Sequence, residues 1–170
     1  MIGPHGSAAA EVATDDDQAL VTLPAGVIAP RTGESAVKVT ITALDPATVA
    51  PAPKGQPYDG NAYRIDATYA GSGAPIVLAA PATVVLRYAI HATRMLRYQD
   101  RGWVTLSVTR YDGSQQVLSS TDRLGIFVAA SGAPISRTMR FLPSARRLRD
   151  GVWTRGDSID GGPILGHLEH

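Results

Sequence analysis

Hydrophobic and polar positions alternate along this chain in short runs that turn-forming residues separate. The clearest run covers residues 37–43, where Val, Ile and Ala at odd positions alternate with Lys and Thr at even positions. Such a period of two is typical of a strand with one buried and one solvated face, as in antiparallel sheets. The same alternation over 61–69 and 103–109 predicts further strands of this kind. The pattern therefore indicates an all-β protein.

The stretch from Arg94 to Ala130 carries several of these strands in close succession, with tight turns at 99–102, 111–114 and 121–123. Residues 44–60 hold four prolines, which cannot donate to a sheet ladder, and predict a long loop. The ranges expected as strands are 19–23, 37–43, 61–69, 76–79, 83–88, 95–98, 103–109, 116–120 and 124–129. Eight or nine strands without crossover helices predict a two-layer antiparallel β-sandwich with Greek-key-like connections. A small barrel is the alternative.

The two ends of the chain differ from its middle. Residues 1–18 are small, polar and acidic without a period, and predict a disordered acidic arm before a sandwich domain at 19–130. Residues 131–170 are expected to form a flexible, basic tail with Gly and Pro, within which 138–142 could add an edge strand. The final Leu168-Glu169-His170 resembles the start of a vector-encoded His tag.

Composition narrows the function classes. The hydrophobic fraction of 44% suffices for a core, and the net charge of +1 argues against a dedicated nucleic-acid binder. The absence of Cys excludes disulfides and thiolate chemistry. No apolar run approaches the length of a membrane span, and the start lacks a signal-peptide pattern. The arginines of the tail could bind an anionic surface, although a solvated linker is the plainer interpretation.

Several segments, taken in order over 19–129, resemble the β-sandwich domain first described in zonula occludens and netrin-receptor proteins, the ZU-five domain. The segments are Pro24-Ala25-Gly26, Gly60 to Ile65, Pro75 to Leu78, Val84 to Tyr88, Leu96-Arg97-Tyr98 with Trp103, and Arg123 to Phe127. Bacterial surface proteins carry relatives of this domain. The resemblance implies a structural or protein-interaction module with an extracellular or cell-surface address.

One departure from the family pattern concerns self-cleavage. Some eukaryotic relatives cut themselves at a Phe-Ser bond, with the Ser as nucleophile and a nearby His. The matching positions here are Leu124 and Gly125, with Arg123 where the His would stand. Because Gly has no hydroxyl, self-cleavage is not expected. Gly125 is instead interpreted as a bulge or a close backbone approach.

Candidate chemistry is sparse. Of the four histidines, His91 alone lies outside the ends, and no nucleophile elbow accompanies it. An unrecognised hydrolase would require His91 beside an acid and a hydroxyl in a cleft. The run Asp15–Asp17, or Asp59 together with Asp66, could attract a cation, but neither has the spacing of a calcium loop. Lys38 shares its face with threonines, which disfavours the buried isopeptide bond of some surface sandwiches. We expect no enzyme activity, metal or cofactor.

Three aromatic residues, Tyr63, Tyr98 and Trp103, are the candidate binding surface, with core packing as the alternative. The favoured hypothesis is a non-enzymatic structural or protein-interaction module of a bacterial surface or secreted protein, which binds a protein partner or itself. The alternative is a carbohydrate- or ligand-binding module, which predicts an exposed aromatic row.

Overall fold

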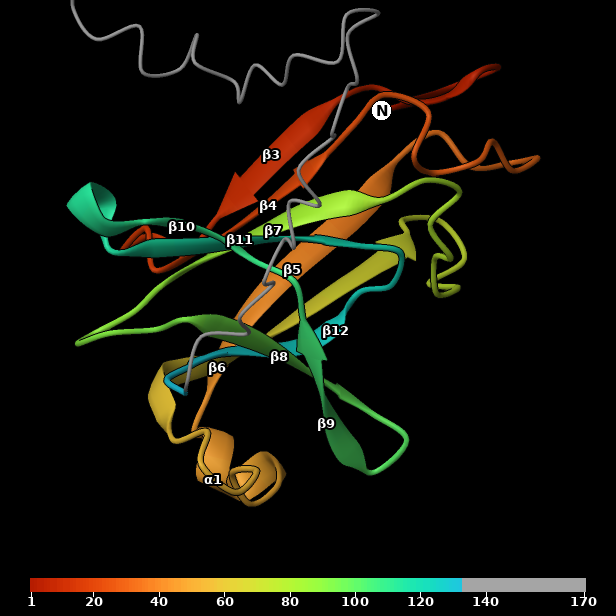
Figure 1. Cartoon of the computed structure of the whole chain (residues 1–170). Helices are drawn as coiled ribbons and strands as arrows, with labels where there is room; N and C mark the ends of the chain where they lie inside the picture. The colour runs from red at the N-terminus through yellow and green to blue at the C-terminus, as the bar shows by residue number, and fades with distance from the viewer. Residues whose placement is uncertain (133–170) are drawn as a thin grey trace, which may run out of the picture. The chain divides into compact units, whose positions relative to one another are not determined.

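Two five-stranded antiparallel sheets face each other in the computed structural model, which describes residues 1–132 (Figure 1). The strands are β1 (Ile2–Gly3), β2 (Gly6–Ser7), β3 (Ala10–Ala13), β4 (Ala19–Leu23), β5 (Val37–Leu44), β6 (Tyr58–Tyr69), β7 (Ala82–Arg87), β8 (Arg94–Gln99), β9 (Gly102–Leu106), β10 (Thr109–Tyr111), β11 (Gln116–Thr121) and β12 (Gly125–Ala130). Two short helices, α1 (Pro46–Val49) and η1 (Asp112–Ser114), lie between strands. The all-β antiparallel sandwich predicted from the sequence is confirmed, with more strands than expected.

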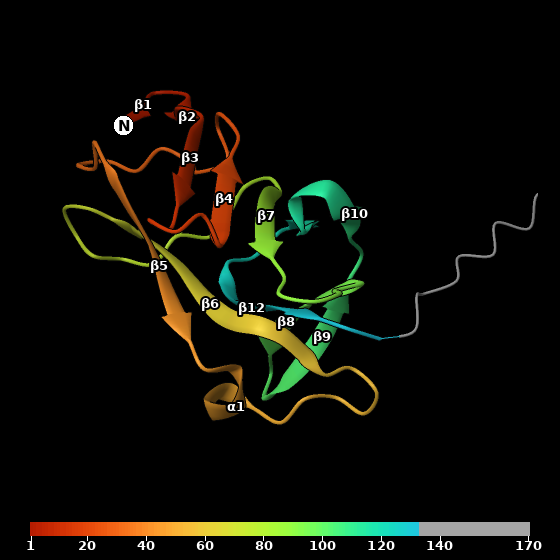
Figure 2. The same ribbon diagram turned by 90° about the vertical axis from the view of Figure 1, so that its left-hand side faces the viewer.

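The first sheet has the order β10-β11-β7-β4-β3 and the second the order β5-β6-β12-β8-β9. Strands far apart in the chain are neighbours, as with β4 beside β7 and β6 beside β12. The chain therefore crosses between the sheets repeatedly, which is the Greek-key-like connectivity expected for a sandwich. Figure 2 shows the two layers from the side, with β5 at the border of the second sheet.

The core between the sheets follows from the alternation of the strands. In β4 and β7 every second residue is buried, and the residues between them are half-buried or exposed. Phe127 on β12 is the largest of the fully buried side chains of this core. The strands of the second sheet contribute Tyr63, Ile65 and Met95 to the same cluster. Burial of these apolar faces supplies the main stabilisation of the sandwich.

The outer face of the second sheet carries a smaller apolar cluster, which buries Ala62, Leu96, Val128 and Ala130. The loop expected over 44–60 is shorter in the structure, because Leu44 ends β5 and β6 already begins at Tyr58. The remaining segment 45–57 contains α1, and Asp45 caps this helix through the Ala47 N–H at 2.9 Å. Two hydrogen bonds anchor the segment to the sheet: the Tyr58 hydroxyl donates to the Ala50 carbonyl, and the Thr105 hydroxyl donates to Gln56.

The disordered arm expected over 1–18 is wrong. Ala10–Ala13 pairs residue by residue with β4, and Ile2 is buried in the main core. The Thr14 hydroxyl accepts the N–H groups of Gln18 and Ala19 and thereby stabilises the turn of this hairpin. The sequence of this strand shows no hydrophobic alternation, because small residues make up half of it. Its extended conformation is decided by the pairing with β4 instead. The domain therefore begins well before residue 19.

Two other strand predictions need correction. The segment 76–79 forms no strand: Leu78 makes a single bridge to Ile28, and Pro75, just before the segment, makes a single bridge to Thr68 of β6. The run 103–109 divides into β9 and β10, since the chain changes sheets between them. The basic tail and the possible strand at 138–142 lie outside the described residues, apart from Ser131 and Gly132.

The core assignment predicts the cost of a truncation. Phe127→Ala should lower the free energy of unfolding by about 3–5 kcal/mol, because it leaves a cavity where both sheets meet. Val77→Ala is the control, since Val77 is 85% exposed and its truncation should cost less than about 0.5 kcal/mol. Urea unfolding of both variants measures the difference. Similar losses in the two variants would contradict the assignment.

Candidate functional site

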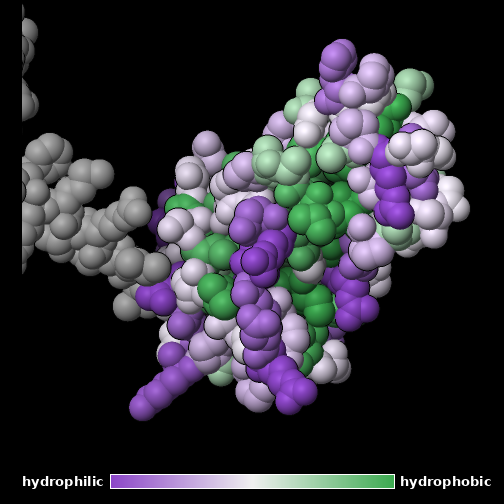
Figure 3. Space-filling view, turned by 90° about the vertical axis from the view of Figure 1, so that its right-hand side faces the viewer, coloured by the Kyte–Doolittle hydropathy of each residue, from purple (hydrophilic) through white to green (hydrophobic). Residues whose placement is uncertain are grey.

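One end of the sandwich carries a groove of about 430 Å³ between the segment 75–78 and the turn that joins β11 to β12. Its lining includes Ile76, Leu78 and Leu124, which are half-buried, and Val77, which is 85% exposed. Figure 3 shows this side of the molecule, where apolar side chains form a band between hydrophilic ones. The groove therefore leaves apolar surface in contact with water.

The groove exists because the strand pairing beside β6 changes there. The last pair between β12 and β6 joins Gly125 to Ile65. Further along β6, the Ala67 carbonyl accepts the N–H of Ile76 at 3.0 Å, so another segment takes the place of β12. Where the two neighbours separate, their side chains form the two walls of the groove.

Gly125 stands at this point for a conformational reason. Its φ of +152° is one that L side chains rarely adopt, so a glycine is required to begin β12 here. The expected close backbone approach is wrong, because a Cβ at this position would meet no atom within 4 Å. The expected bulge lies elsewhere, since the register shift falls between Val128 and Ala130, opposite the start of β6.

A chain of polar contacts borders the groove and joins the two sheets. The Arg97 side chain, 11% exposed, donates from Nη1 to the Thr121 hydroxyl at 2.8 Å and to the Asp122 carboxylate at 3.0 Å. Its Nη2 donates to the side-chain oxygen of Gln99 at 2.8 Å, and Gln99 donates in turn to Asp100. The hydrogen bond from Arg97, together with the charges of Arg97 and Arg123, lowers the pKa of Asp122. The turns at 99–102 and 121–124 are therefore held in one arrangement.

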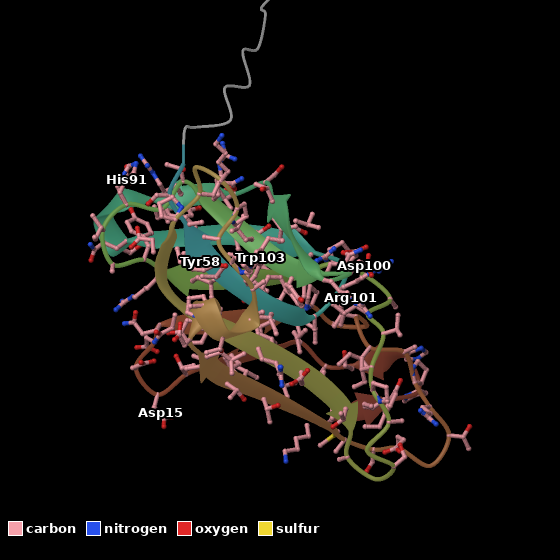
Figure 4. All side chains as sticks on the ribbon, turned by 90° about the horizontal axis from the view of Figure 1, so that it is seen from below. Asp15, Tyr58, His91, Asp100, Arg101 and Trp103 are labelled. Carbon is pink, nitrogen blue, oxygen red and sulfur yellow. The ribbon has the colours of Figure 1, made fainter. Side chains whose placement is uncertain are left out.

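The β8–β9 turn at this end is strained. Asp100 and Arg101 both have positive φ, 50° and 67°, in a two-residue loop between the paired residues Gln99 and Gly102. Such a loop favours Asn or Asp followed by Gly, because glycine alone adopts this conformation without cost. Figure 4 shows Asp100 and Arg101 next to each other, on a different side of the molecule from His91. Non-glycine residues with positive φ are often found at functional sites, where the side chain has a role that offsets the strain.

The aromatic residues proposed from the sequence do not form an exposed row. Tyr63 is 3% exposed and packs in the main core, so its assignment to a binding surface is wrong. Tyr98 and Trp103 are half-buried on the outer face, where their rings meet edge to face with centroids 5.4 Å apart. Tyr58 contacts Trp103 in the same way at 5.7 Å, as their positions in Figure 4 show. The rings are inclined to one another and offer no flat platform.

His91 does not meet the requirement for a general base paired with an acid. Its Nε2 lies 3.1 Å from Nη1 of Arg110, a cation. The nearby carboxylate, Asp112, is bound by the Arg110 guanidinium at 2.7 Å and by the Tyr88 hydroxyl at 3.1 Å. Arg110 therefore stands between the imidazole and the acid.

The acidic candidates have structural roles. Asp59 is 4% exposed, and its carboxylate accepts the backbone N–H groups of Ala89, Ile90 and His91, which fixes the loop before β8. The run Asp15–Asp17 lies at the turn of the β3–β4 hairpin, whereas Asp66 lies on the exposed face of β6. Within residues 1–132, no three acidic or His side chains gather in a metal-binding group.

Sequence reasoning missed the groove and Arg97. The apolar run from Ile76 to Leu78 was visible, but it was interpreted as a strand, and its exposure depends on where β12 begins. Arg97 was read as part of a Leu-Arg-Tyr strand, without its contact to β11. The turn at 99–102 was predicted correctly, although its strain could not be seen without the backbone angles.

Comparison with known proteins adds no family. No family model and no curated protein matches the chain. The resemblance to the ZU-five domain therefore stays a prediction. In the part of the chain that the structure describes, no helix is long and apolar enough to span a membrane.

The strained turn predicts a stabilising substitution. Arg101→Gly should raise the free energy of unfolding by about 0.5–1 kcal/mol, because glycine relieves the positive φ. Arg123→Gly is the matched control, since Arg123 is also exposed but has no positive φ, and this substitution should not stabilise. Thermal and urea unfolding compare the two. Equal effects in both variants would refute the strain at Arg101.

The Arg97–Asp122 contact predicts a pH dependence. Since the pKa of Asp122 is lower in the folded protein, the contact stabilises the fold above the ordinary Asp pKa of about 3.9, and this contribution is lost as the pH falls through the folded value. Asp122→Asn should therefore unfold at a lower temperature than the wild type at pH 7, and the difference should shrink as the pH approaches about 2. A difference that is equal at both pH values would show that charge is not its cause.

Proposed function

We propose that the protein is a non-enzymatic binding module that holds a segment of another protein in the groove between residues 75–78 and 122–124. The observation that carries this proposal is the exposed Val77 beside the half-buried Ile76, Leu78 and Leu124. Contiguous apolar surface that a folded domain leaves in water marks interaction sites, because a partner gains free energy by covering it.

The charges at the border of the groove indicate the chemistry of the partner. Asp122 lies 3.0 Å from Arg97 but 4.0 Å from Arg123, so its stronger contact is with Arg97. The side chain of Arg123 is 66% exposed and can form a paired hydrogen bond with a carboxylate. Asp66 and Asp122 are the other charged residues of the lining, so an acidic group fits only beside Arg123. A segment that combines an apolar side chain with Asp or Glu fits this border.

The polar contacts of Arg97 favour binding because they order the groove in advance. Arg97 fixes the β11–β12 turn through Thr121 and Asp122, and it fixes the β8–β9 turn through Gln99. A surface that is ordered before binding loses less conformational entropy when the partner arrives. The expectation of a protein-interaction module is consistent with this arrangement, while the bacterial origin and the extracellular address stay predictions.

Selection from a displayed random-peptide library tests the proposal. Peptides enriched on the wild-type protein should combine an apolar residue with Asp or Glu, and their affinity should fall by about tenfold or more for Val77→Asp. Arg123→Gln should weaken binding less, because it removes one exposed charge.

Ile90→Asp is the matched control for the selection. Ile90 is an aliphatic residue that is also 85% exposed, but it lies outside the groove. The selected peptides should bind this variant as they bind the wild type. A site in the groove would be contradicted if the peptides bound Val77→Asp as well as the wild type. It would also be contradicted if they failed to bind Ile90→Asp.

A further inference from the structure

The four border strands of the two sheets differ in length. Three of them are short: β3 has four residues, β10 three and β9 five. The fourth, β5, has eight residues. Natural sheets protect their borders by keeping edge strands short, or by placing Pro, bulges or charges in them, because an open edge pairs with other chains. β5 is the border strand whose length calls for such protection.

β5 carries little of that protection. Its sequence from Val37 to Leu44 contains neither Pro nor Gly, and its one charge is Lys38. All eight residues pair with β6 in unbroken register, so no bulge bends the strand. Among the described residues, no backbone hydrogen bond leaves the strand for a partner other than β6. Figure 2 shows β5 at the border of its sheet.

An apolar seam runs beside this edge. Val37 and Val39 point toward the core but remain half-buried, and they line a groove of about 160 Å³ with Ala10 and Val12 of β3. The opening lies where the borders of the two sheets face each other. A strand added next to β5 would supply hydrogen-bond partners to its free edge and would cover this seam.

We propose that β5 of a second copy of this chain occupies the edge, antiparallel to the first, and joins the two second sheets into one sheet of ten strands, five from each copy. A second copy fits this edge because β5 is complementary to itself. With Thr40 opposite Thr40 of the second copy, Lys38 faces Thr42 and no like charges meet. A shift by two residues places Thr40 opposite Thr42 and is equally free of repulsion.

Pairing through β5 closes after two copies. A two-fold axis uses the same strand from both chains, so no equivalent long edge is left for a third. The groove between 75–78 and 122–124 lies on the other flank of β6, so this inference does not depend on the proposed function.

Charge-swapped variants of the full chain test the dimer. The variants T40K/T42K and K38T/T40E/T42E place like charges opposite each other in either register, and positions 38, 40 and 42 all lie on the exposed face. Replacing Lys38 in the acidic variant removes the attraction that the new carboxylate at position 42 would otherwise have for Lys38 of the second copy. Sedimentation velocity over a concentration series should show the wild type passing from the mass of one chain to that of two. Each variant alone should dimerise about tenfold or more weakly. An equimolar mixture of the two variants should recover the two-chain species.

Three checks accompany this experiment. Circular dichroism establishes that the variants fold. T109K and T109E, on the short exposed edge strand β10, serve as controls and should leave dimerisation unchanged. Hydrogen exchange on the wild type is independent of any substitution, and the amides of β5 should become more protected as the concentration rises. A wild type that stays monomeric, variants that dimerise as the wild type does, or a mixture that stays monomeric would each overturn the proposal.

Discussion

The burial of β12 on both faces is the constraint on which the rest of this structure depends. Its residues Ile126 to Ala130 form a continuous apolar run in which Phe127 and Ala129 face the sandwich core, while Val128 and Ala130 face outward and are equally buried. A strand with two apolar faces needs a layer on each side. The first sheet supplies one layer, and Leu44 with the rings of Tyr58 and Trp103 packs against the other face. Trp103 and Tyr98 therefore serve the packing of the outer face.

This arrangement divides the outer face of the second sheet into two halves. The apolar half is centred on Val128 and is covered by Leu44, Tyr58 and Trp103, whereas the other half carries polar residues of β5 and β6 such as Lys38, Thr40 and Arg64. Only the part of the outer face that the apolar residues of β12 and β8 form needs a layer packed against it. The polar row of β5 is left exposed for this reason, and the inner side of the strand meets a seam that the short β3 does not close.

The sequence predicted the parts of the fold that depend on local pattern. The period of two placed the strands at 37–43, 61–69 and 83–88. Ala10–Ala13 was missed because four small or mixed residues carry no pattern, and β4 supplies their pairing. The same limit applies to the site. The pattern put Tyr63 on one face with Ile65, but the choice of the inward face depends on the opposite sheet.

The groove was harder to predict than the fold, because it forms where β12 and the segment 75–78 diverge from each other beside β6. The two walls of the groove come from the segment 75–78 and the turn at 122–124, which are distant in the chain, and its shape depends on the residue at which β12 replaces the segment 75–78 beside β6. Arg97 shows the same dependence, since its burial and its charge partner come from β11 and the turn after it. The alternation of apolar and polar residues can place a side chain on one face of a strand. It does not show the residue at which the two segments next to that strand separate.

The two proposed surfaces are compatible because β6 separates them. One flank of β6 pairs with β5 along Val37–Leu44, and the other flank borders the groove at Ile65–Ala67. A dimer through β5 would leave both grooves open, with the two β6 strands three strand spacings apart, or about 14 Å across the sheet. A partner with two suitable segments could then engage both grooves at once, and the second contact would form at a high effective concentration. Weak binding in a single groove would in this way become strong binding by the pair.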